Sequence, residues 1–209
     1  MGRSRASLSC LLALALSTAA AQAQPGENPS PSKILEALKA RSKLRNPTVV
    51  EQPQATTAEQ RQTDERQRLL EALTAKVPRG LSEEERSQLA ALAKDQPSVD
   101  LVIYFHFNSA EISVKAMGAV VALGKALSDA ELKGRTFLVA GHTDALGTPE
   151  YNRALSDKRA RAVKQFLVER FRLPESQLLA VGYGEEQLKN SQNPNADENR
   201  RVQVVNLGK

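Results

Sequence analysis

The chain has 209 residues, of which 29 are Lys or Arg and 24 are Asp or Glu, giving a formal net charge of +5. Aromatic residues make up 4% and tryptophan is absent, which argues against a stacking platform for single-stranded nucleic acid. Residues 24–96 carry 12 basic and 11 acidic side chains, and residues 97–209 carry 15 and 13. Because a nucleic-acid footprint needs a concentrated basic patch, no nucleic-acid partner is expected.

The first 23 residues have the pattern of a secretory signal peptide. Two arginines precede an apolar run over residues 8–21, and a small-x-small pattern at 21–23 predicts cleavage after Ala23. The run of about 14 residues is shorter than the roughly 20 needed to span a bilayer. Cys10, the only cysteine, lies near the start of this run, so neither lipidation nor a disulfide is expected. We therefore expect an exported mature chain without a transmembrane span.

Residues 24–96 are expected to form a polar linker, part helical and part disordered. Five prolines among Ser, Asn, Gln and Thr give residues 24–56 a linker composition. A short helix is predicted within this stretch, over Lys33–Leu44.

Two further helical segments are predicted before the first strand. Residues 57–76 have helical propensity, but residues 57–68 lack an apolar face, which is typical of a solvated helix or of disorder. The helix predicted at 82–94 is better defined, because Ser82 and Glu85 form a capping-box pattern ahead of a short apolar stripe.

Residues 97–209 are expected to form one domain of the α/β (α+β) class. β-branched and aromatic residues predict strands, and apolar residues at helical spacing predict helices. The predicted elements are a strand at Val99–Phe107, a helix at Ser113–Leu127, a strand at Arg135–Ala140, a helix at Pro149–Phe171, a strand at Gln177–Gly182 and a strand at Arg200–Leu207. The β-α-β-α-β-β order predicts a sandwich of a mixed sheet and helices.

Arg159 is the anomaly of the helix predicted at Pro149–Phe171. On a wheel that advances about 100° per residue from Leu155, Arg159 falls near 40°, inside the stripe formed by Leu155, Val163 and Phe166. Four other charged residues of this helix fall on the opposite, solvated side. A charge that faces a core is costly unless it is paired, so Arg159 should have an anionic partner in the protein or in a ligand.

The loop Gly141–Gly147, between the second predicted strand and this helix, offers a candidate site. It lies at the C-terminal end of a strand, where open α/β sheets build their sites, and the helix N-terminus favours an anion. Asp144 favours a cation, and Arg159 can bind a carboxylate through paired N–H groups. These groups suit a zwitterion, but an ion pair between Asp144 and Arg159 themselves would explain the same pattern.

Several stretches, taken together, resemble a known family. They are Ile103–Ala110, Gly141-His142-Thr143-Asp144 with Gly147, Asn152, Leu155-Ser156 and Arg159-Ala160, Gly182-Tyr183-Gly184-Glu185 and Asn199-Arg200-Arg201-Val202. In this order and spacing they resemble the OmpA-like C-terminal domain, which Pal lipoproteins and MotB stator proteins share. The resemblance covers residues 97–208.

The resemblance implies non-covalent binding of peptidoglycan through the diaminopimelate of the stem peptide, whose free end is a zwitterion. It implies Asp144 and Arg159 as the principal contacts. Five further residues fall where the family lines its pocket: Asn108, Thr143, Asn152, Leu155 and Arg201. The implied role is anchoring or scaffolding in the Gram-negative cell envelope, without a cofactor. Peptidoglycan and other envelope proteins are the implied partners, in the periplasm and in association with the outer membrane or the cell wall.

The chain also departs from the family in several ways. His106 stands where many members have Asp, which would make binding pH-dependent if that position touched ligand. The sequence shows no eight-stranded barrel, transmembrane helix or lipobox ahead of the domain, so it resembles neither a porin-like member nor a stator or lipoprotein as a whole.

A cell-wall hydrolase and an envelope interaction scaffold without wall binding are the alternative functions. The candidate catalytic groups are His106, His142, Asp144, Ser109, Ser156, Glu185 and Glu186. The histidines and the aspartate match no metalloprotease spacing, and no nucleophile-elbow pattern surrounds the serines. The adjacent glutamates would point to opposite sides of an extended segment. We therefore expect a binding module and not an enzyme.

Overall fold

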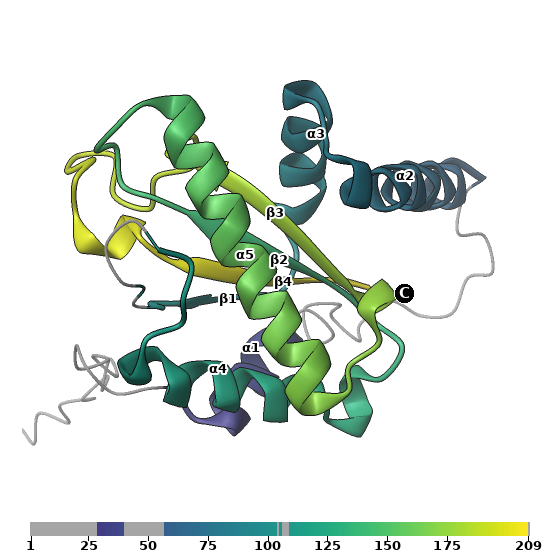
Figure 1. Cartoon of the computed structure of the whole chain (residues 1–209). Coiled ribbons are helices and arrows are strands. Elements are labelled where there is room, and N and C mark those ends of the chain that lie inside the picture. Colours follow the sequence, from purple (N-terminus) through teal and green to yellow (C-terminus); the bar gives the residue numbers. More distant parts are fainter. Residues whose placement is uncertain (1–28, 40–56, 104, 106–108, 209) are drawn as a thin grey trace, which may run out of the picture.

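The computed structural model describes residues 29–39, 57–103, 105 and 109–208. The predicted signal peptide lies outside the described residues, and so do His106 and Asn108. The helices are α1 (Pro31–Lys39), α2 (Thr57–Lys76), α3 (Glu83–Ala93), α4 (Val114–Leu127) and α5 (Pro149–Phe171), and the strands are β1 (Ser98–Leu101), β2 (Thr136–His142), β3 (Leu178–Gly184) and β4 (Val202–Gly208) (Figure 1).

The strands form one mixed four-stranded sheet in the order β1-β4-β2-β3. β2 and β3 are parallel, and β4 is antiparallel to both β1 and β2. β1 and β2 therefore run in the same direction with β4 inserted between them, so α4 and α5 each connect two strands of equal direction. The predicted β-α-β-α-β-β order and the mixed sheet are confirmed.

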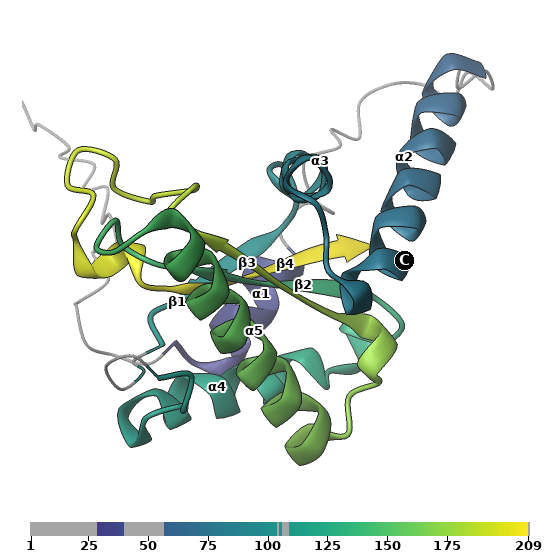
Figure 2. The ribbon, with the colours of Figure 1, turned by 45° about the horizontal axis from the view of Figure 1, so that its top comes forward.

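Helices cover both faces of the sheet. Figure 2 shows α1, α4 and α5 on one side of the sheet and α2 and α3 on the other. Alternate side chains of β2 enter the two layers: Phe137 and Val139 pack with the first group of helices, and Leu138 and Ala140 pack with the second. This alternation is the two-residue period of a strand, and it explains why every residue from Phe137 to His142 is buried.

The N-terminal helices take part in these layers. Ile34 and Leu38 of α1 are fully buried in the core beside α4, and Asn206 of β4 donates a hydrogen bond from Nδ2 to the Leu38 carbonyl oxygen at 3.1 Å. α1 begins at Pro31, two residues earlier than predicted, and residues 40–44 of the predicted helix lie outside the described residues.

The helix predicted at 82–94 is confirmed as α3. Ser82 Oγ accepts from the Glu85 amide at 3.2 Å, and Glu85 Oε2 accepts from the Ser82 amide at 2.9 Å. This capping box satisfies two amides that have no partner within the helix, and it sets where α3 begins. Leu89 and Ala93 then bury the inner side of α3 against the sheet.

The first strand is shorter than predicted. The strand expected over Val99–Phe107 ends at Leu101, and Phe105 forms only an isolated bridge with Ile112. β1 ends where its partner strand β4 begins. Leu101 pairs with Val202, the first residue of β4, so β4 offers no backbone for pairing beyond that point. The prediction was therefore wrong for Val102, Ile103 and Phe105, and the rest of its second half lies outside the described residues.

The remaining boundaries differ by small amounts. β2 and β3 each run two residues further than predicted, to His142 and Gly184. β4 begins at Val202 instead of Arg200, because a short 3-10 turn at Asp197–Asn199 precedes it. α5 has the predicted bounds, with Thr148 as N-cap.

Candidate functional site

The predicted site loop lies at the edge of the sheet where the parallel strands β2 and β3 end. The Thr143 amide donates to the Gly184 carbonyl oxygen at 2.9 Å, which joins the loop to the end of β3. The Ala145 amide donates to the Pro194 carbonyl oxygen at 3.1 Å, which joins it to the segment before β4. The loop is therefore held from two sides, and Asp144 lies between these anchors.

The first turn of α5 closes the third side of the loop. Thr148 Oγ1 accepts from the Tyr151 amide at 3.3 Å, so the helix begins directly after the loop. Asn152 is buried, and its Nδ2 donates to the Asp144 carbonyl oxygen at 3.3 Å and to Glu185 Oε2 at 2.5 Å. Asn152 thus holds the backbone of the loop in position beside α5.

Asp144 is 6% exposed and has two partners for its carboxylate. Oδ1 accepts from the Leu146 amide at 3.3 Å, and Oδ2 accepts from Arg200 Nη1 at 2.7 Å. The hydrogen bond to Asp144 raises the pKa of Arg200, against the opposing effect of burial. Because an ionised carboxylate offers about four acceptor positions, Asp144 retains capacity for a further donor.

Arg159 is 8% exposed, as the helical wheel predicted, but it lies at the edge of the buried face of α5. The prediction that it lies in the middle of the stripe was wrong. The buried residues of α5 are Asn152, Ser156, Arg159, Ala160, Val163 and Leu167, whereas Leu155 is only half-buried. The face is rotated because Gly141 and Gly182 let the backbone at Ser156 approach the sheet.

Arg159 contacts a backbone oxygen and an aromatic ring. Nε donates to the Ser109 carbonyl oxygen at 3.2 Å, and the guanidinium carbon lies 4.8 Å from the centre of the Phe105 ring. Among the described residues, no carboxylate lies within ion-pair distance of Arg159, since Asp144 pairs with Arg200. Burial lowers the pKa of Arg159, and the nearby charge of Asp144 opposes this. The internal Asp144–Arg159 ion pair that the sequence left open is therefore not formed.

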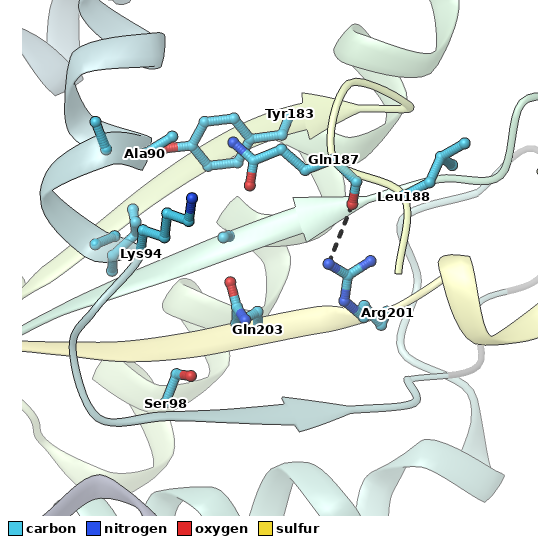
Figure 3. A pocket seen from close by; sticks show the side chains of 12 residues that line it. Ala90, Lys94, Ser98, Tyr183, Gln187, Leu188, Arg201 and Gln203 are labelled. Atoms are coloured by element: carbon cyan, nitrogen blue, oxygen red, sulfur yellow. Dashed lines mark hydrogen bonds between the residues drawn. The ribbon is translucent and has the colours of Figure 1, made fainter. Parts of the chain in front are cut away.

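The other predicted pocket residues divide into two groups. Thr143 is buried at the site, and its Oγ1 has no hydrogen-bond partner among the described residues. Arg201, in contrast, lies against the α3 layer, where Nη2 donates to the Gln187 carbonyl oxygen at 3.2 Å (Figure 3). Its Nε lies 3.5 Å from Asp100 Oδ1. The structure therefore brings Thr143 and Asn152 to Asp144, and it places Arg201 in a different cleft.

Two contacts of the site were missed in the sequence. Arg200, and not its neighbour Arg201, reaches Asp144, and the Phe105 ring lies against Arg159. When two arginines are adjacent before a strand, the sequence does not show which layer each side chain enters. This becomes known only with the strand register. Phe105 was assigned to a strand, so its contact with a helix was not foreseen.

The groups considered for catalysis have structural partners. Ser156 Oγ accepts from the Gly184 amide at 2.9 Å and donates to the Arg153 carbonyl oxygen at 2.8 Å. Glu185 and Glu186 lie in a turn instead of the expected extended segment, and they contact Asn152 and Arg153 respectively. Through these contacts the serine and both glutamates hold α5 against the end of β3.

His142 is a buried residue of the core at the end of β2. Its ring stacks on Tyr183 with centroids 5.7 Å apart and an angle of 16° between the planes. Burial, with a contribution from the charge of Arg201, lowers the pKa of His142 to about 3, so the ring is neutral at pH 7. Across the part of the chain that the structure describes, no three His, Cys, Asp or Glu side chains gather as metal ligands would.

Comparison with known proteins agrees with the family resemblance of the sequence motifs. Residues 104–201 match the OmpA family. A peptidoglycan-associated lipoprotein of Pseudomonas putida is 37% identical over 103 residues, covering 48% of this chain and 60% of the relative. A peptidoglycan-associated lipoprotein of Pseudomonas aeruginosa is 40% identical over 83 residues, covering 40% of this chain and 47% of the relative. The chain thus spans about half the length of these curated relatives.

Solved structures are also similar to the chain. The crystal structure of the peptidoglycan-associated lipoprotein from Burkholderia pseudomallei matches 55% of this chain and 92% of that chain, with 28% identity and a TM-score of 0.42.

No helix within the described ranges has the length and apolar character that crossing a membrane requires.

Proposed function

Because residues 104–201 match the OmpA family, we propose that this chain binds peptidoglycan non-covalently and serves as an anchor or scaffold in the Gram-negative cell envelope. The relatives named above are peptidoglycan-associated lipoproteins, which supports a binding role over a hydrolase. The expected localisation, in the periplasm and associated with the envelope, agrees with these relatives.

The observation that carries the proposal is a buried arginine without a carboxylate partner beside a buried aspartate. Among the described residues, Arg159 contacts a backbone oxygen and an aromatic ring, and neither neutralises its charge. A carboxylate of the ligand would supply the missing anion, and it would form charge-assisted hydrogen bonds with the guanidinium. The free acceptor capacity of Asp144 would bind the ammonium of the same ligand.

This arrangement favours the zwitterionic end of diaminopimelate in the stem peptide as the recognised group. The loop backbone and Asn152 hold Asp144 in place, and Arg200 donates a hydrogen bond to its carboxylate. Asp144 and Arg159 are the principal contacts in this proposal, with Thr143, Asn152 and Leu155 around them. Asn108 belongs to the proposed pocket but lies outside the described residues, and Arg201 faces the other cleft.

Co-sedimentation with insoluble sacculi tests this function. We expect the wild-type protein to sediment with sacculi without releasing soluble fragments, and Arg159→Ala and Asp144→Ala to lose this binding. Loss of one charge-assisted contact costs about 2 kcal/mol, so affinity should fall roughly 30-fold. Wild-type-like sedimentation of both variants would reject the pocket, and release of soluble fragments would favour the hydrolase.

Matched controls exist on the same helix. Arg161 and Asp157 form an exposed ion pair at 2.8 Å on the solvent side of α5. Arg161→Ala and Asp157→Ala remove the same charges without touching the loop, and they should sediment as the wild type does. Circular dichroism of all four variants separates loss of binding from loss of fold.

A further inference from the structure

A second cleft lies on the opposite layer of the sheet, between α3 and the strands. It has a volume of about 400 Å³, and Figure 3 shows the side chains that line it. Its floor is the apolar surface of Leu138 and Ala140, and three alanines of α3 form one wall. The polar groups around it are Lys94, Ser98, Tyr183, Gln187, Arg201 and Gln203.

All the charged side chains that line this α3 cleft are cationic. Its 12 lining residues include two cations, Lys94 and Arg201, and no Asp or Glu. The nearest described anion of Arg201 is Asp100, which also forms an ion pair with Lys189 at 3.1 Å. The positive charge of the cleft is therefore only partly balanced by the protein.

Buried donors in the cleft also lack partners. Arg201 is 8% exposed, its Nε forms an ion pair with Asp100 Oδ1 at 3.5 Å, and its Nη1 has no hydrogen-bond partner among the described residues. The hydroxyl of Tyr183, which is 2% exposed, is likewise without one. A buried donor without an acceptor is costly, and more so when it is charged, so such groups indicate an acceptor that the described residues do not supply.

From these observations we propose that the α3 cleft binds a small organic anion with a short apolar part. The anionic group would lie between Lys94 and Arg201, and the apolar part would lie on Leu138 and Ala140. The lining of the cleft includes neither Asp144 nor Arg159. The cleft is therefore separate from the loop site, and the proposal does not depend on the function of that site.

Backbone NMR titration of the mature chain, residues 24–209, tests the proposal. The probes are hexanoate, hexyl phosphate and, as a cation with the same apolar part, hexylammonium. We expect saturable shifts of the Lys94, Ser98 and Gln203 amides with an anionic probe and none with hexylammonium. The stronger of the two anions identifies the preferred group, carboxylate or phosphate.

Variants locate the bound anion. Lys94 and Ala91 are exposed, so Lys94→Gln and Ala91→Phe change the cleft without disturbing the core. Lys94→Gln should weaken binding about tenfold, and Ala91→Phe should block it. Lys115→Gln changes an exposed lysine of α4 on the other layer and should bind as the wild type does.

Three results would overturn the proposal: no saturable shift with either anion, equal shifts with hexylammonium, or unchanged binding in both Lys94→Gln and Ala91→Phe. Saturable shifts confined to the amides of the loop Gly141–Gly147 would also overturn it, because the anion would then occupy the loop site.

Discussion

Arg159 and His142 show two ways in which a buried polar side chain is accommodated. Arg159 keeps its charge at the edge of the core, where a backbone oxygen and the Phe105 ring replace part of its hydration. His142 lies deeper and stacks on Tyr183, and it avoids the cost of burying a charge by remaining neutral. The charged residue is available to a ligand, whereas the neutral one belongs to the core.

The depressed pKa of His142 predicts a pH dependence of stability. The folded-state pKa of about 3 lies below the ordinary 6.5, so the unfolded chain binds the proton more strongly. The contribution of His142 is fully present above about pH 6.5 and is lost as pH falls toward 3. Between pH 7 and pH 5, chemical denaturation should show a loss of about 2 kcal/mol from this group.

His142→Phe supplies the control for this prediction. Phenylalanine keeps the stacking on Tyr183 and removes the titration, so its stability should fall less than that of the wild type over the same pH interval. Equal slopes in the two proteins would contradict the assignment.

The position of α5 depends on two glycines in the strands beneath it. A Cβ at Gly141 would lie 2.2 Å from the Ser156 carbonyl oxygen, and one at Gly182 would lie 2.3 Å from the Asp157 amide nitrogen. Only glycine permits this close approach of helix and sheet. The approach buries Ser156 and Ala160 and thereby turns Arg159 to the edge facing Phe105 and Ser109.

Gly182→Ala should therefore destabilise the fold by about 2 kcal/mol or more, since backbone atoms must move to admit the methyl group. Thermal or urea unfolding measures the change. Gly118→Ala, at an exposed position of α4, is the matched control and should be neutral or stabilising by up to about 1 kcal/mol. A wild-type midpoint for Gly182→Ala would show that the helix and the sheet are less closely packed.

At the scale of the whole molecule, the chain before residue 97 contributes to the body around the sheet. α1 packs against α4 in one layer, and α3 packs against the other face. The predicted division into a linker at 24–96 and a domain at 97–209 stays a prediction, and the packing of Ile34 gives a way to test it.

Ile34→Ala removes a side chain that is 0% exposed, so it should lower the free energy of unfolding by about 3 kcal/mol. Lys33→Ala, at the exposed neighbouring position, should change it by less than about 0.5 kcal/mol. Urea denaturation of residues 24–209, the predicted mature chain, compares the two. If Ile34→Ala unfolds like the wild type, α1 belongs to the linker and not to the core.

The sequence by itself determined the order of the elements, the bounds of α5, the capped start of α3 and the burial of Arg159. These features depend on local periodicity and capping, which neighbouring residues specify. Only the tertiary structure decided where β1 ends, which arginine contacts Asp144 and to which cleft Arg201 belongs. Each of these depends on strand register, which joins residues far apart in the chain, and the close approach at Gly141 and Gly182 decided in the same way which edge of α5 Arg159 occupies.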